Sequence, residues 1–209
     1  MEFENLIYKK SNLEQNDSIS TYNGWAAQQN PHCFEIFYNF LKKNKPKRIL
    51  EIGTALGGFT YFLKHSCKRL QLDCEILSFD IHGRHYYEEM IKYGIDVRVE
   101  NIFDEKYEKL NQEIINFIKL DGLTLVLCDG GNKIGEFNLI SKFLKKGDII
   151  MAHDYAYDRE TFDKKINLKL WNWFEISEKD IQDACITNNL VDIDRDLFEK
   201  AVWVSKIKI

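Results

Sequence analysis

The chain has 209 residues, which is enough for one well-buried domain and too few for two full ones. Hydrophobic residues make up 44% of it and aromatic residues 13%, as expected for a packed globular core. The formal net charge of -4 provides no global basic field, so composition argues against nucleic acid as a partner. No apolar run has membrane-spanning length, and residues 1–10 lack the apolar centre of a signal peptide. We therefore expect a cytoplasmic protein without a membrane partner.

The cysteines are odd in number, and none of the five forms a C-x-x-C pair. This usage favours free thiols in a reducing compartment over a disulfide framework or a zinc site. It therefore agrees with an intracellular location.

Residues 1–30 look irregular, with a turn-prone stretch at 11–18, and we interpret them as a cap or lid segment. From residue 31 the chain alternates helices and short apolar strands. Helices are predicted at 31–45, 58–70, 86–93, 107–119, 137–144 and 177–187, the last capped by Ser177. Strands are predicted at 48–52, 75–79, 96–100, 123–128, 148–152, 190–197 and 201–209.

This order of elements predicts an α/β fold in a single domain, residues 31–209. We expect a Rossmann-like, doubly wound and mostly parallel sheet of seven strands, with an antiparallel hairpin from the C-terminus at its edge. In such sheets the carboxyl ends of the strands meet on one rim, where ligands bind.

The stretch 48–63 reads as a buried strand, a glycine-rich turn and the start of a helix. Gly53 ends the apolar run, and Gly57 and Gly58 open the next element. Glycine permits a sharp turn and a close ligand, because it has no Cβ. The following helix offers unpaired N–H groups, so the turn predicts a nucleotide-like ligand, although a turn that only packs well stays an alternative.

The spacing of these glycines bears on which ligand binds. Ala55 stands where G-x-G-x-x-G needs its second glycine, and Glu51 would repel a phosphate but attract an amino group or a sulfonium. The pattern E-I-G-T-A-x-G-G resembles the first motif of class I S-adenosylmethionine-dependent methyltransferases. That resemblance implies a set of cofactor-binding residues, namely Glu51, Gly53, Thr54, Gly57 and Gly58.

Acidic and amide residues follow the next two strands. Asp80 ends the second strand, where a carboxylate can accept both hydroxyls of a ribose. This chemistry is common to S-adenosylmethionine and NAD, and a turn aspartate or helix cap is the alternative. In the family, the loop after the third strand supplies a side chain near adenine, so the resemblance implies Asn101 or Asp104 there.

Asp129 follows the fourth strand, and His153 and Asp154 follow the fifth. Adjacent strand ends would bring the three together as a divalent-ion site, with Mg or Mn as the expected ion. The arrangement resembles the metal-dependent O-methyltransferases. The stretch Gln29-Asn-Pro31 together with residues 45–58 looks like the cephalosporin hydroxylase and rhamnosyl O-methyltransferase group, and residues 153–155 are similar to the macrocin O-methyltransferase-like group. The resemblance implies that all three residues bind the metal and that Asp129 also contacts the cofactor. In the family this position usually holds an acidic residue, so His153 is a departure. The alternative role of His153 is a hydrogen bond to Asp129 or Asp154 without a metal.

Catalytic roles are suggested for three residues. In catechol-type O-methyltransferases a lysine in the loop after the fourth strand is the general base, and the resemblance implies this for Lys133. A metal nearby would lower its pKa, whereas a solvated loop lysine is the alternative. Asp129 is the base if no metal binds, with His153 as its acid/base partner.

These features predict a methyltransferase that uses S-adenosylmethionine, with metal assistance, on a hydroxyl of a sugar or other small molecule. No Asn/Asp-Pro-Pro-Tyr loop of nucleic-acid methyltransferases is present. Two alternatives stay open: an NAD-dependent oxidoreductase, and a non-catalytic S-adenosylmethionine-binding partner protein. The sequence specifies neither the acceptor nor whether the protein forms a homo-oligomer.

Overall fold

The computed structural model of the chain describes residues 6–8, 20–85 and 87–209. Its centre is a seven-stranded sheet in the order β11-β12-β8-β7-β4-β5-β6. The five strands from β8 to β6 are parallel, and β12 runs antiparallel to both β8 and β11. The predicted fold is therefore confirmed. The strands are β4 (Arg48–Ile52), β5 (Glu75–Asp80), β6 (Asp96–Val99), β7 (Thr124–Cys128), β8 (Ile149–His153), β11 (Leu190–Asp192) and β12 (Trp203–Lys208).

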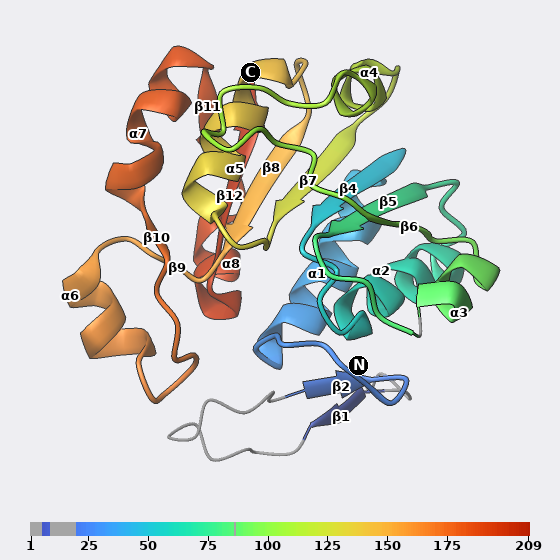
Figure 1. Cartoon of the computed structure of the whole chain (residues 1–209). Coiled ribbons are helices and arrows are strands. Elements are labelled where there is room, and N and C mark those ends of the chain that lie inside the picture. The colour runs from blue at the N-terminus through green and yellow to red at the C-terminus, as the bar shows by residue number, and fades with distance from the viewer. Residues whose placement is uncertain (1–5, 9–19, 86) are drawn as a thin grey trace.

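Helices cover both faces of this sheet (Figure 1). One layer consists of α1 (His32–Asn44), α2 (Gly58–Arg69), α3 (Tyr87–Lys92) and α8 (Arg195–Ala201). The other layer consists of α4 (Gln112–Lys119), α5 (Lys133–Ile140) and α7 (Glu178–Thr187), with a 3₁₀ turn at Ser141–Phe143.

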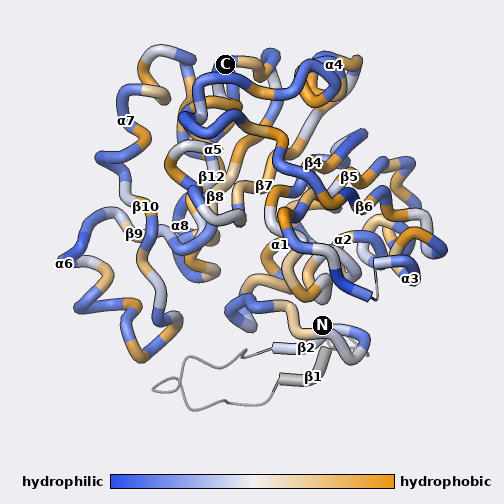
Figure 2. Tube along the Cα trace, viewed as in Figure 1, coloured by the Kyte–Doolittle hydropathy of each residue, from blue (hydrophilic) through white to orange (hydrophobic). Residues whose placement is uncertain are grey.

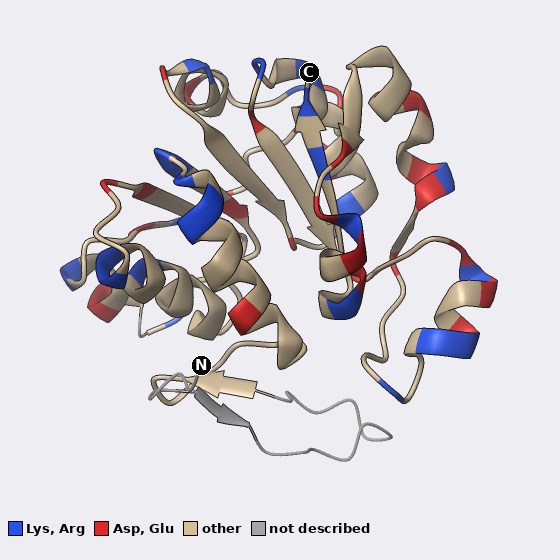
Figure 3. Ribbon diagram, turned by 180° about the vertical axis from the view of Figure 1, so that it is seen from behind, with Lys and Arg blue, Asp and Glu red and all other residues tan. Residues whose placement is uncertain are grey.

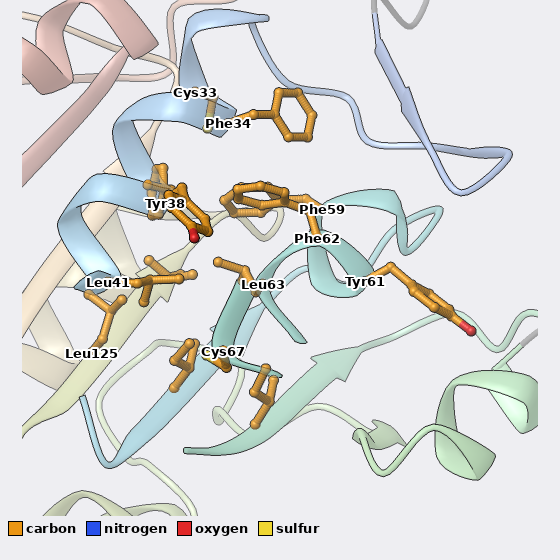
Figure 4. Close-up of a cluster of buried hydrophobic side chains, with 14 of the residues drawn as sticks. Cys33, Phe34, Tyr38, Leu41, Phe59, Tyr61, Phe62, Leu63, Cys67 and Leu125 are labelled. Carbon is orange, nitrogen blue, oxygen red and sulfur yellow. The ribbon is translucent and has the colours of Figure 1, made fainter. Parts of the chain in front are cut away.

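Alternate side chains of the strands pack into two separate cores, one on each face of the sheet. In β7, Leu125 and Leu127 pack into the α1–α2 core, whereas Val126 and Cys128 pack into the α4–α5 core. Figure 4 shows how aromatic rings of α1 and α2 interlock in the first core, and Figure 2 shows the apolar strands at the centre of the molecule. Because all five cysteines are buried and free, the prediction of free thiols is confirmed.

The prediction of an irregular N-terminus is wrong for its described part. Strands β1 (Leu6–Tyr8), β2 (Ser20–Tyr22) and β3 (Trp25–Ala26) form a small antiparallel sheet. Asn23 and Gly24 connect β2 to β3 with positive φ angles of 54° and 83°, the geometry that an Asn-Gly hairpin turn favours. The turn-prone stretch at 11–18 lies outside the described residues.

The N-terminal sheet sits against α2. A Cβ on Gly58 would lie 2.4 Å from the backbone oxygen of Trp25, so α2 and β3 approach each other at backbone distance. The Trp25 and Tyr61 rings meet edge to face with centroids 4.2 Å apart. This segment is thereby held on the layer that borders the glycine turn.

Two predicted helices begin elsewhere because asparagine caps were missed. The helix expected at 107–119 begins at Gln112, since Asn111 caps it by accepting a bond from the N–H of Glu113. The helix expected at 137–144 begins earlier, at Lys133, after the cap residue Asn132. It ends at Ile140.

The C-terminal prediction is partly wrong. The strand expected at 190–197 stops at Asp192 and is followed by α8, so β11 and β12 are joined by a helix instead of a tight turn. The capped helix at Ser177 is confirmed, because Asp180 accepts bonds from the N–H and hydroxyl of Ser177.

An unpredicted segment of short elements follows β8, and we call residues 155–177 the post-β8 segment. It contains β9 (Tyr155–Ala156), α6 (Arg159–Thr161), a π-helical turn (Phe162–Ile166) and β10 (Ile176–Ser177). Apolar residues in the middle of this segment form a small core with Val202, whereas Tyr155 and Ile176 at its ends pack into the α4–α5 core. This segment frames the site described below.

Charges of both signs are interspersed along the helices seen from behind in Figure 3. Within the described part of the chain, no helix is both long enough and apolar enough to cross a membrane.

Candidate active site

The glycine turn brings the ends of β4 and β7 into contact. Gly53 has φ +93°, and a Cβ there would lie 2.2 Å from the backbone oxygen of Asp129. Its N–H donates to the carbonyl of Phe79 at 2.8 Å. Gly53 is therefore required by backbone packing at this crossing, whether or not a ligand is bound.

Gly57 and Gly58 serve the neighbouring contacts. Gly57 caps α2 with φ +76°, and a Cβ on it would press against the sulfur of Met90 at 2.9 Å. Gly58 faces β3, as described above. Neither glycine lines the cavities described below, so both serve close packing within the turn.

Two cavities open at the carboxyl ends of the strands. The larger has a volume of about 480 Å³ and lies over β5, β6 and the loop after β7. The smaller, of about 270 Å³, lies between the glycine turn and the post-β8 segment. Their shared lining residues are Gln28, Gly53, Ala55 and Asp129.

Asp80 lies in the wall of the larger cavity. One of its oxygens accepts a bond from the N–H of Ala55 at 2.7 Å, and the other accepts one from the N–H of His82 at 2.8 Å. Asn101 lines the same cavity. Asp104 does not, because its carboxylate holds a turn by accepting the N–H groups of Glu108 and Lys109.

Glu51 lies in the wall of the smaller cavity and is only 2% exposed. Its carboxylate accepts bonds from the hydroxyls of Thr60, at 2.7 Å, and Ser78. Burial raises the pKa of Glu51 to about 7, so the carboxyl is partly protonated near neutral pH. Thr54 also lines this cavity, and its hydroxyl bonds to that of Ser78 at 2.6 Å.

Asp129, His153 and Asp154 converge in the smaller cavity, and each offers a donor atom within 4.8 Å of the others. Nδ1 of His153 lies 3.1 Å from Asp129 and 3.5 Å from Asp154. The imidazole stacks on Trp203, with centroids 4.9 Å apart. Its Nε2 is buried and has no hydrogen-bond partner among the described residues. Burial disfavours the imidazolium, but the two carboxylates outweigh it and raise the pKa of His153.

Asp154 is held in an unusual backbone conformation with φ +57°. Its side chain accepts bonds from the indole of Trp171 and from Lys133, whose Nζ lies 2.8 Å away. Burial favours the protonated form, yet His153 and Lys133 overcome it and lower the pKa of Asp154. The cavity therefore holds Asp154 as a carboxylate.

Lys133 is only 6% exposed, and its ammonium group is surrounded by oxygen atoms that accept its three protons in hydrogen bonds. Besides Asp154, it donates to Glu175 at 2.8 Å and to the carbonyl of Gly130 at 3.0 Å, with Asp129 at 3.7 Å. Burial opposes the charge, but the carboxylates prevail and raise the pKa of Lys133. The lowering expected from a neighbouring metal stays a prediction, and the buried Lys133 is not a solvated loop lysine.

Comparison with protein families decides the class. The model of the FtsJ-like methyltransferase family matches residues 32–153, more than half of the 209 residues. The chain belongs to the FtsJ-like methyltransferase family. It is a class I S-adenosylmethionine-dependent methyltransferase, which removes the oxidoreductase and non-catalytic alternatives.

Solved structures share the fold of this methyltransferase. One described as the CmcI-N160 apo-structure has a TM-score of 0.64 at 12% identity, covering 92% of this chain and 77% of that one. Another, described as cmcI-D160 Mg-SAM, has a TM-score of 0.59 at 12% identity and covers 90% and 76%. A putative caffeoyl-CoA O-methyltransferase from Staphylococcus aureus has a TM-score of 0.50 at 14% identity and covers 85% and 83%. No curated protein matches the sequence.

Three polar residues of this methyltransferase's site were not among those predicted from the sequence. Glu175 comes from the post-β8 segment, and the sequence did not single out this residue. Glu136 lines the larger cavity and bonds to the N–H groups of Gly130 and Asn132, and burial raises its pKa to about 7. Gln29 belongs to the predicted cap segment, but its bond to Asp129 was not predicted.

Proposed function

We propose that this methyltransferase transfers the methyl group of S-adenosylmethionine to a hydroxyl of a sugar or other small molecule, assisted by Mg or Mn. The observation that carries the proposal is the convergence of Asp129, His153 and Asp154 within 4.8 Å, in a cavity continuous with the glycine turn. Methyl transfer in such a site depends mainly on positioning the acceptor against the sulfonium.

The larger cavity would take the adenosine part of the cofactor. Asp80 keeps lone pairs beyond its two backbone bonds, so it can still accept ribose hydroxyls. Asn101 would face the base, whereas the turn-holding Asp104 is left out of this proposal. Glu51, Gly53 and Thr54 would face the methionine part from the smaller cavity, where the carboxylate of Glu51 suits an ammonium group.

The donor set fits a divalent ion. Two carboxylates and one imidazole are ligands that Mn accepts, and Mg prefers the carboxylates. Gln29 and Trp171 each bond to one oxygen of a carboxylate, and those oxygens keep lone pairs for a metal. When bound, the ion would act as a Lewis acid that lowers the pKa of an acceptor hydroxyl. A structure with this fold is described as binding Mg and SAM, in agreement with the proposal.

Side chains of the protein would stabilise charge, accept the proton and bind the acceptor. Lys133, held as an ammonium, would stabilise negative charge developing on the acceptor oxygen. If no metal binds, Asp129 would instead be the base that takes up the hydroxyl proton, with His153 at 3.1 Å as its acid/base partner. The rings of Trp171, Trp173 and Phe59 line the same cavity and suit the face of a sugar. Residues 20–30 would form part of the predicted cap, since Gln28 lines both cavities.

The test is methyl transfer from labelled S-adenosylmethionine to a panel of sugars and polyols, with and without Mn. Asp129→Asn and Asp154→Asn should each lower turnover by about 100-fold or more while leaving S-adenosylhomocysteine binding intact. Asp73→Asn is the control, because that side chain is fully exposed and lines neither cavity, and it should match the wild type. Unaltered turnover in both site variants would reject the metal role.

A further inference from the structure

Gln29 connects the N-terminal segment to the floor of the active site. It precedes α1 by a few residues and is only 1% exposed. Its Nε2 donates to Oδ2 of Asp129 at 2.8 Å, and its Oε1 accepts a bond from the indole of Trp203 at 2.9 Å. One amide thus joins the loop after β7 to strand β12.

Hydrogen-bond chemistry fixes the direction of this amide. An indole N–H is a donor only, so the oxygen of Gln29 must face Trp203. The NH₂ group is then forced toward Asp129, whose carboxylate is an acceptor. The thiol of Cys33 lies 3.4 Å from the same amide oxygen and supports the same orientation.

The backbone of Gln29 is anchored as well. Its carbonyl accepts a bond from the hydroxyl of the buried Ser20 at 2.9 Å. Trp203, which orients the amide, also stacks on the imidazole of His153. Two side chains that face the proposed metal are therefore steadied by one connected set of contacts.

We propose that Gln29 is a positioning residue for Asp129. By binding Oδ2 it restrains rotation of the carboxylate and leaves Oδ1 turned toward His153 and the cavity. A carboxylate held in this way binds a cation without first losing rotational freedom. The inference rests on the proposed function, because it takes Asp129 as a metal ligand.

The experiment is calorimetric titration of Mn and, separately, of S-adenosylhomocysteine into the full-length protein. Gln29→Met keeps the length and apolar volume of the side chain but removes both the donor to Asp129 and the acceptor of the Trp203 indole, and Gln29→Ala is the second variant. Mn affinity should fall about 10–100-fold in both, with S-adenosylhomocysteine affinity within about twofold of the wild type. In turnover, kcat should fall more than the KM of the cofactor rises.

Asn188→Ala is the matched control for general loss of stability. Its amide bonds to Ser141 and Ala184 at the end of α7, away from both cavities, so Mn affinity should stay unchanged. Wild-type Mn affinity retained in Gln29→Met would overturn the positioning role. A wild-type protein that binds S-adenosylhomocysteine but no Mn would reject the metal role and this inference with it.

Discussion

Buried carboxyl groups determine how the stability of this protein responds to pH. Burial raises the pKa of Glu51 from its ordinary value of 4.5 to about 7. At this residue the folded state therefore binds more protons than the unfolded state between these values, so its contribution to the free energy of unfolding falls as pH rises through that window. Glu136, with a pKa raised to about 7, acts in the same direction.

Glu51→Gln removes one of these groups while keeping an oxygen that accepts bonds from Thr60 and Ser78. Relative to the wild type, the variant should gain about 2 kcal/mol of unfolding free energy between pH 5 and pH 8. Urea denaturation at the two pH values measures this difference. Glu160→Gln, at an exposed ion pair, is the control and should show no such change. A pH-independent difference for Glu51→Gln would contradict the raised pKa.

At the scale of single residues, the sequence indicated which side chains meet but not their charge environment. Asp129, His153 and Asp154 follow neighbouring parallel strands, so topology alone brings them together. The state of Lys133 depends on Glu175, which returns to the cavity from a segment without periodic pattern. The raised pKa of Lys133 could therefore not be predicted from the sequence.

At the scale of elements, the crossing of β4 and β7 depends on Gly53. Gly53→Ala should lower the free energy of unfolding by about 3–5 kcal/mol, because it combines a positive φ with a clash against the backbone of Asp129. Gly147→Ala is the matched control, since Gly147 has φ +90° but a Cβ there would meet nothing within 4 Å. Its cost should be about 1–2 kcal/mol.

Denaturant melts of the two glycine variants separate backbone strain from close packing. The difference between them measures the contact of β4 with the loop after β7. Equal losses for both variants would show that the close approach at Gly53 contributes nothing.

Strands were predicted well because buried parallel strands are short apolar runs, as in β4 and β7. Helix starts were predicted poorly where an asparagine cap decides them, as at Asn111 and Asn132. The helix α8 was missed because residues 190–197 carry alternating apolar residues that also suit a strand. The post-β8 segment has only short elements held by tertiary contacts, which local patterns do not report.

At the scale of the whole molecule, three distant parts of the chain build one site. The sheet rim supplies Gly53, Asp80 and Asp129, the N-terminal segment supplies Gln28, and the post-β8 segment supplies Glu175. The two cavities share Gln28, Gly53, Ala55 and Asp129 in their walls, and we propose that one cofactor spans both, from the adenosine side to the acceptor side. This shared wall is the main structural argument for the proposed placement of S-adenosylmethionine.

The most direct test of the account is calorimetric titration of S-adenosylhomocysteine and of NAD into the wild-type protein, with and without Mg and Mn. The account predicts tight binding of S-adenosylhomocysteine, no binding of NAD, and much weaker binding of S-adenosylhomocysteine to Asp80→Ala. Failure of S-adenosylhomocysteine to bind, or undiminished binding to Asp80→Ala, would contradict the placement of the cofactor in these cavities.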